Sequence, residues 1–261
     1  MWNEYFGIQR KVSVSISRRV CWLFALCTAL ISNSATAQET LRIGVEEINY
    51  LPHYRFADGE FTGFAGEFLA QFAKDQNYRL DFRPLPVKRL LADLLDGAID
   101  LKYPDDPTWT PALREGKEIS YSDPVVGYVD GVMVPIDRVG RGLESIKTLG
   151  AVAGFDPKGW EGRIADRSVA LRESRGFDAL MKMVANGRLD AVYGNAAVML
   201  VNAETSGLRD KVALDLSLPH NRGFYRLSTV KRPILIREVN SWMKRNEGWI
   251  QKLKAAYELA Y

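Results

Sequence analysis

Cysteine and histidine are nearly absent from this 261-residue sequence. Its two cysteines, Cys21 and Cys27, both lie among the first 37 residues, and its two histidines are His53 and His220. Transition-metal sites draw mainly on these two residue types, so the sequence gives little basis for a metal site. Beyond residue 37 there is neither a disulfide nor a thiol nucleophile, and we expect a fold that is stabilised by packing and holds no cofactor.

A hydrophobic run long enough to span a membrane is also absent. The apolar run at residues 20–31 has 12 residues, against the roughly 20 that a spanning helix needs. Arg18 and Arg19 are among the basic residues that precede this run, and Ala35 and Ala37 follow it at the spacing of a cleavage site. Residues 1–37 are therefore predicted to be a secretory signal peptide, cleaved near Ala37, that exports the rest of the chain to the periplasm.

The chain that would remain after cleavage has no excess of positive or negative charge. Removing residues 1–37 takes four Lys and Arg residues and Glu4 from totals of 35 basic and 32 acidic residues, which leaves 31 of each. A chain without net charge gives no electrostatic argument for binding nucleic acid or an anionic membrane. We therefore expect a small-molecule partner and no nucleic acid.

Strand-like and helix-like segments alternate beyond residue 40, which is typical of α/β folds with parallel sheets. A first strand-helix-strand-helix-strand series is predicted at residues 41–45, 63–77, 78–85, 87–96 and 98–103. A second series of strands and helices is predicted at residues 149–153, 169–172, 176–185, 189–193 and 196–205. Further strands are expected at residues 128–136 and 224–230, and helical sequence at residues 232–259 with an interruption near Gly248.

This order predicts an α/β fold of two lobes joined by a two-segment hinge. Lobe 1 is expected to comprise residues 38–130 and 223–261, and lobe 2 residues 131–222. Ligands of open α/β sheets bind beyond the carboxyl ends of the strands, so the predicted site is a cleft between the lobes.

Four short motifs follow one another along this frame. They are YLPHYRF, DG and FTGF within residues 50–64, LADLLDGAID at 91–100, ISYSDP at 119–124 and NGRLDAV at 186–192. In this order they resemble the bacterial extracellular solute-binding proteins of family 3. The resemblance implies the periplasmic binding protein-like II fold and a role in amino-acid ABC transport. Within these motifs, Gly97 and Gly187 are expected to end helices, and Asp100 and Asp190 to begin or flank strands.

The resemblance also points to candidate ligand residues in lobe 1. Tyr50, His53 and Tyr54 fall on a loop that lines the cleft in the family, where their rings would either stack on a ligand or pack the loop itself. Farther along, the family commonly has an arginine that binds the ligand's carboxylate through two parallel hydrogen bonds. Arg114 stands one residue from that expected position. The same stretch carries further candidates that would either face the cleft or form a solvated acidic turn: Lys102, Tyr103, Asp105, Asp106 and Trp109.

In lobe 2, Gly154 and Phe155 begin a glycine-rich stretch after a predicted strand. This stretch would either bind an anion through backbone N–H groups at a helix N-terminus or simply connect two elements. Asn195 stands where amino-acid binders of the family carry an aspartate that pairs with the ligand's ammonium group. An amide carries no charge, so Asn195 and the displaced Arg114 argue against a standard α-amino acid as the ligand.

These observations predict a monomeric periplasmic solute-binding protein rather than an enzyme. It would capture a small polar molecule, amino-acid-like or another organic solute, and deliver it to the permease of an ABC transporter or present it to a membrane sensor. The alternative is a periplasmic enzyme of the same fold, because some relatives of the family are dehydratases. Candidate acids and bases exist, but none stands in a recognisable catalytic pattern: Glu46, Glu47, His53, Asp105 and Asp106.

Overall fold

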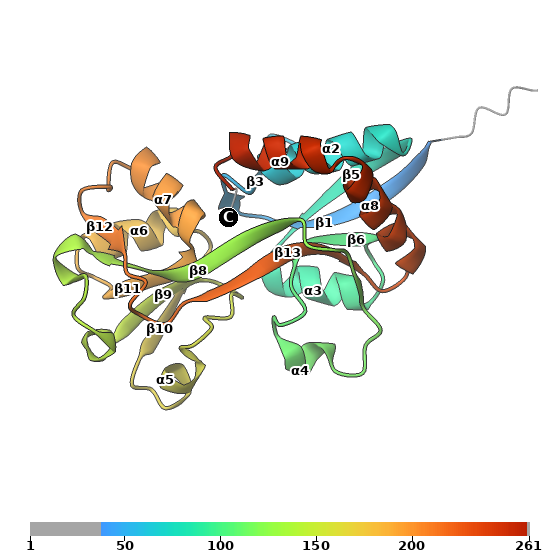
Figure 1. Cartoon of the computed structure of the whole chain (residues 1–261). Helices are drawn as coiled ribbons and strands as arrows, with labels where there is room; N and C mark the ends of the chain where they lie inside the picture. Colours follow the sequence, from blue (N-terminus) through green and yellow to red (C-terminus); the bar gives the residue numbers. More distant parts are fainter. Residues whose placement is uncertain (1–37, 260–261) are drawn as a thin grey trace, which may run out of the picture. The chain divides into compact units, whose positions relative to one another are not determined.

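Strands from both predicted series join in one mixed sheet. The computed structural model describes residues 38–259 (Figure 1), so the signal peptide predicted at residues 1–37 lies outside the described residues. Most strands lie side by side in the order β10 (Ala170–Ser174), β9 (Thr148–Val152), β11 (Ala191–Asn195), β8 (Val126–Pro135), β13 (Asn221–Thr229), β6 (Leu101–Asp105), β1 (Glu39–Glu46) and β5 (Tyr78–Leu85). In addition, β12 (Val212–Leu214) pairs with β8, and β7 (Ser120–Tyr121) pairs with β13.

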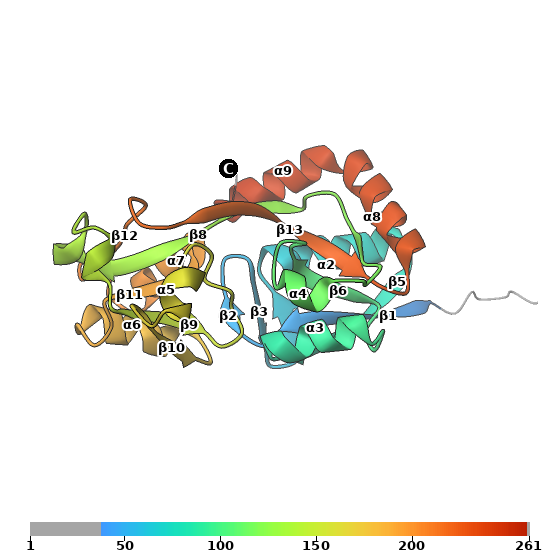
Figure 2. The same cartoon turned by 90° about the horizontal axis from the view of Figure 1, so that it is seen from below.

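The half of the sheet formed by β6, β1 and β5 carries helices on both faces (Figures 1 and 2). β1 pairs in parallel with both of its neighbours. Helix α2 (Phe64–Asp75) lies on one face with α8 (Pro233–Arg245) and α9 (Glu247–Ala256), and α3 (Val87–Leu95) lies on the other. The predicted apolar stripe of α2 is buried, because the rings of Phe68 and Phe72 pack on Trp242 of α8 at centroid distances of 5.3 and 5.5 Å.

The half formed by β10, β9 and β11 is parallel as well. Helix α6 (Phe177–Ala185) precedes β11, and α7 (Ala196–Thr205) follows it directly, whereas the short helix α5 (Glu161–Ala165) lies between β9 and β10 in the chain. The apolar side chains of α6 pack on the sheet where Gly150 of β9 leaves room, since a Cβ there would stand 2.9 Å from Leu180. The strands and the helices α6 and α7 of this half therefore follow the order that the sequence predicts.

Two long strands, β8 and β13, run between the two halves (Figure 1). The first five residues of β13 pair with β8, from Asn221 with Asp130 to Tyr225 with Val126. Its later residues pair with β6 and β7, so one strand passes from one half of the sheet to the other. The expected hinge segments, residues 128–136 and 224–230, overlap these two strands. The lobe boundaries predicted after residues 130 and 222 fall within them.

The stretch between β1 and α2 differs from the expectation of a loop. It forms a second, three-stranded sheet of β2 (Asn49–Tyr50), β3 (Tyr54–Ala57) and β4 (Glu60–Thr62). Asp58 and Gly59 join β3 to β4 with φ angles of 55° and 82°, the positive values that a two-residue hairpin turn requires and that Asp-Gly supplies. The DG motif therefore closes a hairpin.

Other differences are at the ends of elements. The strand expected at residues 98–103 begins only at Leu101, and the C-terminal helical sequence breaks at Asn246 rather than at Gly248. The four-residue helix α4 (Pro111–Arg114) was not expected, nor were two short 3₁₀ helices, η1 (Ile136–Arg138) and η2 (Leu143–Ser145). All of them are too short for apolar periodicity to be visible in the sequence.

The motif residues expected to have structural roles have them. Gly97 and Gly187 follow α3 and α6 with φ angles of 68° and 69°, the left-handed conformation that ends helices. The carboxylate of Asp100 accepts the backbone N–H of Arg42 at 2.8 Å, and that of Asp190 accepts the backbone N–H of Thr148 at 2.8 Å. Each aspartate thus ties its own strand end to a neighbouring strand.

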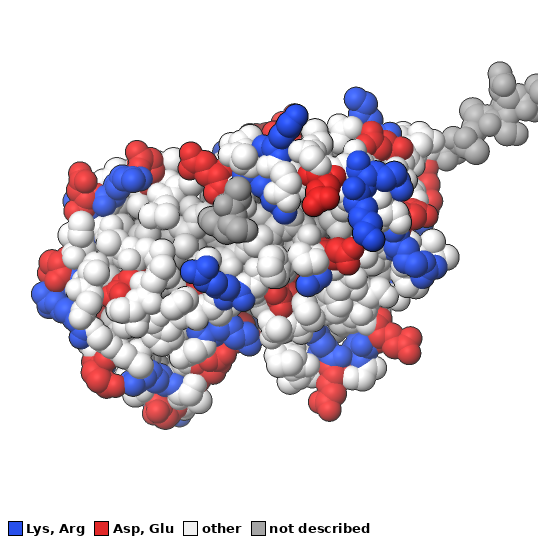
Figure 3. All heavy atoms as spheres, in the orientation of Figure 1, with Lys and Arg blue, Asp and Glu red and all other residues white. Residues whose placement is uncertain are grey.

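Basic and acidic side chains are intermixed over the face drawn in Figure 3. This agrees with the equal numbers of the two kinds beyond residue 37. In the part of the chain that the structure describes, no helix is long and apolar enough to cross a membrane.

Candidate functional site

A cavity of about 220 Å³ lies where the strands of both halves end. Glu46, at the end of β1, and Pro104, near the end of β6, line it from one half. Tyr193 of β11 lines it from the other half, and Asp130 of β8 and Tyr225 of β13, the two strands that run between the halves, complete the wall. Because both halves supply side chains, a molecule in this cavity would contact them at the same time.

Aromatic rings form much of the wall. Tyr50 stacks on Tyr54 at a centroid distance of 5.0 Å and meets the edge of Phe155, from the other half, at 5.9 Å. Trp109 packs against Tyr225 at 5.8 Å, and the hydroxyl oxygens of Tyr50 and Tyr225 lie 3.2 Å apart within hydrogen-bond distance. Rings have an electron-rich face, so this wall suits a flat apolar group or a cation.

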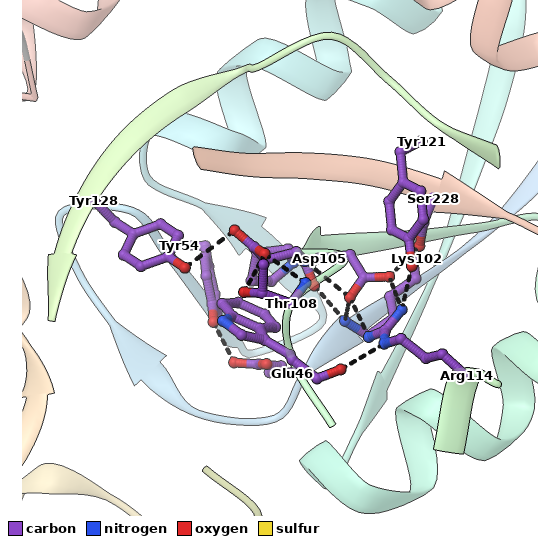
Figure 4. Close-up of polar contacts among 12 residues, drawn as sticks. Glu46, Tyr54, Lys102, Asp105, Thr108, Arg114, Tyr121, Tyr128 and Ser228 are labelled. Carbon is purple, nitrogen blue, oxygen red and sulfur yellow. Dashed lines mark hydrogen bonds and ion pairs between the residues drawn. The ribbon is translucent and has the colours of Figure 1, made fainter. Parts of the chain in front are cut away.

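One side of the cavity rests on a buried ionic network around Asp105 (Figure 4). Its carboxylate accepts hydrogen bonds from Lys102 Nζ at 2.9 Å, from Arg114 Nη1 and Nη2 at 3.0 and 2.6 Å, and from Ser228 Oγ at 2.5 Å. Burial alone would raise the pKa of Asp105, but the two cations outweigh it and hold that pKa below its ordinary value. Asp105 is therefore an ionised anchor for Lys102 and Arg114.

Arg114 is fully engaged by the protein on the face that would hold a carboxylate. Besides its paired bonds to Asp105, its Nε donates to the carbonyl oxygen of Trp109 at 2.7 Å and its Nη1 donates to the hydroxyl of Tyr121 at 2.6 Å. Arg114 lines the cavity, but its two-pronged face is directed at Asp105. The ligand clamp suggested by the resemblance is thus occupied by a side chain of the same chain.

Glu46 is buried on the opposite side of Lys102 and accepts a short hydrogen bond from the hydroxyl of Tyr54. Burial raises the pKa of Glu46 above its ordinary value, although Lys102 opposes the effect. Asp106, next to the cavity, accepts hydrogen bonds from the backbone and side chain of Thr108 and from the hydroxyl of Tyr128. Both acidic side chains are held by neutral donors.

Asp130 is the acidic cavity residue whose burial is least offset by hydrogen bonds or opposite charges. It is 8% exposed, and within residues 38–259 its Oδ1 has no hydrogen-bond partner. Burial, followed by the carboxyl groups of Asp106 and Glu46, raises the pKa of Asp130 to about 8. The strand places this carboxyl group between Asn195 of β11 and Asn221 of β13, its register partners on either side.

The structure brings seven of the twelve candidate ligand residues to the cavity wall. These are Tyr50, Tyr54, Lys102, Trp109, Arg114, Gly154 and Phe155. The other five are buried and do not line the cavity: His53, Tyr103, Asp105, Asp106 and Asn195.

The side chains of His53 and Asn195 lie inside the protein and not on the cavity wall. Both ring nitrogens of His53 lack a hydrogen-bond partner in the described chain, and burial lowers the pKa of His53 to about 3, so its ring is neutral. Asn195 caps α7, where its Oδ1 accepts the backbone N–H of Val198 at 3.2 Å, and its Nδ2 donates to the Tyr225 hydroxyl at 3.2 Å. Its amide is therefore used within the protein.

The glycine-rich stretch at residues 154–160 connects two elements and is no open anion site. The N–H groups of Gly154 and Gly159 already donate to carboxylates of the protein, those of Glu173 at 3.1 Å and Glu161 at 2.6 Å. The helix that follows, α5, has five residues and begins only at Glu161.

Sequence reasoning did not assign several wall residues to the ligand. Glu46 stands at the carboxyl end of β1. Ligands of open α/β sheets bind at the carboxyl ends of strands, so this position could have indicated a wall residue. Asp130 is a single acidic residue in the otherwise apolar strand sequence VGYVDGVMVP, which is the visible sign of a charge placed inside the fold. The remaining unassigned wall residues are Val87, Lys88, Leu91, Pro104, Thr110, Leu113, Asp156, Tyr193 and Tyr225.

No protein-family model matches the chain. A probable amino-acid-binding protein, YxeM of Bacillus subtilis (strain 168), is 22% identical over 256 residues, which covers 95% of each chain. An ancestral arginine-binding protein bound to arginine superposes with a TM-score of 0.65 at 19% identity, covering 84% of this chain and 97% of that one. The ancestral amino-acid-binding protein AncCDT-1, a precursor of cyclohexadienyl dehydratase, gives a TM-score of 0.67 at 19% identity, covering 85% and 96%. The fold is therefore the periplasmic binding protein-like II fold that the sequence predicts. The curated relative is a probable amino-acid-binding protein, which agrees with the resemblance to the extracellular solute-binding proteins of family 3.

Proposed function

We propose that the chain is a periplasmic solute-binding protein that captures a small organic molecule in the cavity and passes it to a membrane transporter. The observation that carries this proposal is that one cavity of about 220 Å³ takes its wall from both halves of the sheet. Pockets for drug-sized ligands occupy about 300–1,000 Å³, so the expected ligand is small.

Closure around the ligand follows from the same geometry. Tyr50 and Trp109 line the cavity from one half, and Phe155 and Tyr193 line it from the other. A ligand that contacts both halves binds the closed arrangement more tightly than an open one, and it shifts the equilibrium by that difference in affinity. β8 and β13, the two strands shared between the halves, are the proposed hinge.

Binding is favoured over catalysis by the state of the acidic and basic groups. An acid–base enzyme needs a titrating group free to exchange a proton with the substrate. Asp105, Lys102 and Arg114 are bonded to one another, and the neutral His53 lies behind the wall. Asp130 is the exception, because its carboxyl group borders the cavity with a pKa of about 8, but within residues 38–259 no second acid or base is hydrogen-bonded to it to form a catalytic pair. The similarity to a precursor of a dehydratase keeps turnover as the second candidate, which the experiment below separates from binding.

The permease of an ABC transporter is the proposed partner, with a membrane sensor as the alternative. The probable amino-acid-binding protein of Bacillus subtilis is similar in sequence, and a substrate-binding protein of an amino-acid ABC transporter is similar in fold. The predicted signal at residues 1–37 supports a periplasmic location. A monomer suffices for this role, because one chain supplies the whole cavity wall.

The proposal is tested by thermal unfolding of residues 38–261, refolded from denaturant to remove any bound ligand. The protein is screened against amino acids, amines, small carboxylates, sugars and cyclic compounds. A ligand that binds only the folded protein raises the unfolding midpoint with its concentration. A rise with one class, with the compound recovered unchanged, supports a solute receptor. Conversion of the compound to a product would favour the enzyme, and no rise with any class would contradict the proposal.

A matched pair of variants ties the effect to the cavity. Phe155→Ala removes a ring from the wall and should abolish most of the ligand-induced rise. Ile234→Ala removes an apolar side chain from an exposed position of α8, outside both this cavity and the proposed hinge, and should leave the rise unchanged.

A further inference from the structure

The carboxyl group of Asp130 is buried beside a cavity without a partner of opposite charge. Its Oδ1 makes no hydrogen bond within residues 38–259. The amides of its register partners do not serve it, because Asn195 donates to Tyr225 and Asn221 accepts from the hydroxyl of Tyr193 at 2.8 Å. A buried polar group without a partner destabilises a protein, because it has lost its hydrogen bonds to water and gained none in return. A ligand that brings a donor to this position removes that cost.

The charged groups around the cavity also favour a cationic ligand, because acidic side chains outnumber basic ones. Lys102 and Arg114 are both bound to Asp105. Glu46 and Asp106 are held by hydroxyl or backbone N–H donors, so they and Asp130 have no basic side chain as a hydrogen-bond partner among the described residues. At the rim, Lys88 lies 3.9 Å from Glu173, and Lys158 lies 2.7 Å from Asp156. The interior therefore has more carboxyl groups than cations.

The aromatic wall adds attraction for the same kind of ligand. Tyr50, Trp109, Phe155, Tyr193 and Tyr225 line the cavity that Asp130 borders. An ammonium group is attracted to the electron-rich face of such a ring, and more than one ring can contribute. Lys102 Nζ already lies 5.4 Å from the centre of the Trp109 ring, so Tyr50, Phe155, Tyr193 and Tyr225 are the rings offered to a ligand cation. Rings combined with a single unpaired carboxyl group favour an alkylammonium ion.

A carboxylate on the ligand meets no corresponding site. The paired N–H face of Arg114 holds Asp105, and the N–H of Gly154 holds Glu173. A second negative group in the cavity would instead lie among Glu46 and Asp130. Like charges at short distance in a site shielded from water repel strongly.

We propose that the cavity binds a small alkylammonium compound without a carboxylate, with Asp130 as its counterion and the aromatic rings as its walls. This inference rests on the proposed function as a solute receptor and names the class of solute.

The test compares amino acids with the amines that differ from them only by loss of the carboxylate. Calorimetric titrations of refolded residues 38–261 at pH 8 use four such pairs: lysine and cadaverine, ornithine and putrescine, arginine and agmatine, phenylalanine and phenethylamine. The amine of at least one pair should bind at least tenfold more tightly than its amino acid. Tighter binding of the amino acid in every pair that binds would overturn the inference.

The counterion is tested with the best-binding amine and two variants. Asp130→Asn keeps the shape of the side chain and removes its charge, and it should weaken amine binding at least tenfold. Asp210→Asn removes the same charge from an exposed position of the same half and should leave binding within about twofold. Unchanged amine binding by the Asp130→Asn protein, folded by circular dichroism, would overturn the counterion role.

Failure of this inference is distinguishable from failure of the proposed function. Binding of an amino acid, a sugar or a small carboxylate in preference to every amine would leave the solute receptor standing and remove the cationic ligand. Binding of no compound class would contradict both.

Discussion

Asp130 of β8 and Asn195 of β11 are register partners across an antiparallel pair of strands. Asn195 occupies the position where the family resemblance leads one to expect a charged ligand contact, and its amide caps α7 instead. The carboxyl group lies one strand away, on a residue that belongs to the expected hinge. In the proposed site, the charge missing at position 195 is supplied by the spatial neighbour Asp130, and this changes the chemistry expected of the ligand.

Amine affinity should rise with pH between 6 and 8. Asp130 has a pKa of about 8 in the empty protein, because burial and the carboxyl groups of Asp106 and Glu46 disfavour its charge. Binding of a cation requires the ionised form, so the affinity should increase about tenfold per pH unit below pH 8 and level off above it. Calorimetry in two buffers of different ionisation enthalpy measures the proton released on binding.

The tyrosines and asparagines around Asp130 do not produce this dependence. Burial raises the pKa values of Tyr128, Tyr193 and Tyr225 far above this range, and the register partners Asn195 and Asn221 carry no charge. Glu46 also lines the cavity, and burial raises its pKa as well. The Asp130→Asn protein should therefore show a much weaker pH dependence from 6 to 8, with Glu46 as the source of any that remains. An affinity that falls as the pH rises would contradict the role of Asp130.

The same carboxyl group should make the empty protein less stable as the pH rises. An aspartate in the unfolded chain has a pKa of about 4, and Asp130 in the folded protein has a pKa of about 8. Between these values the folded state binds a proton that the unfolded state does not, so stability falls with pH through this window. Asp130→Asn should raise the unfolding midpoint by several degrees at pH 8 and by little at pH 4.5, as scanning calorimetry would measure.

Asp210→Asn is the matched control for this stability effect. Asp210 is exposed, so its replacement should shift the midpoint by less than about 1 °C at either pH. A midpoint for Asp130→Asn that is lower at pH 8 than that of the unchanged protein would show that the Asp130 carboxylate stabilises the empty fold.

Asp105→Asn should destabilise the protein strongly at neutral pH. The substitution leaves Lys102 and Arg114 buried without their shared carboxylate, and breaking a buried ion pair in this way costs about 3–5 kcal/mol. The pKa of Asp105 is below its ordinary value, so its contribution is present above pH 4 and is lost as the pH falls through the folded-state pKa. Denaturant unfolding at pH 7 and at pH 3 should show a difference that shrinks at the acidic pH.

Arg114→Lys is a milder change to the same network, and its loss of stability can be compared with that of Asp105→Asn. A lysine keeps a positive charge near Asp105 but loses the paired hydrogen bonds, so its destabilisation should be smaller than that of Asp105→Asn. Equal stability of the Asp105→Asn protein and the unchanged protein at pH 7 would contradict the anchoring role of the network.

The sequence predicts local structure well where one periodic face is buried. Phe64, Phe68, Leu69 and Phe72 place α2 because their spacing reflects the side of the helix that packs on the sheet. The hairpin at residues 54–62 was missed although Asp58-Gly59 marks its turn, because its strands are only three and four residues long.

The candidate site was predictable only in part, for a physical reason. Aromatic residues such as Tyr50 and Trp109 follow strand ends, and that position alone suggests a cavity wall. The pairing of Asp105 with Arg114, and of Asp130 with Asn195, depends on contacts between distant parts of the chain. No local pattern records those contacts, so the residues can be identified from the sequence but their partners cannot.

Ligand binding should change the intrinsic fluorescence of the protein through Trp109. Residues 38–261 contain four tryptophans, and of these Trp109 lines the cavity whereas Trp160 and Trp242 are buried in the core. Lys102 Nζ already lies 5.4 Å from the centre of the Trp109 ring. A ligand in the cavity that contacts the rest of this ring alters the surroundings of Trp109 directly. Trp109→Phe should therefore remove most of the fluorescence change while keeping a ring in the wall, so that calorimetry still detects binding, weakened by up to about tenfold.

Trp249→Phe separates this signal from a general change of the fold. Trp249 lies in α9, against Trp242 and outside the cavity wall, so its loss should lower the total emission and preserve the ligand-induced change. If instead the change persists in the Trp109→Phe protein and disappears in the Trp249→Phe protein, the ligand acts on the helices that cover β1 and β5. The cavity bordered by Asp130 would then not be the binding site, because a ligand there lies against the Trp109 ring and not against α9.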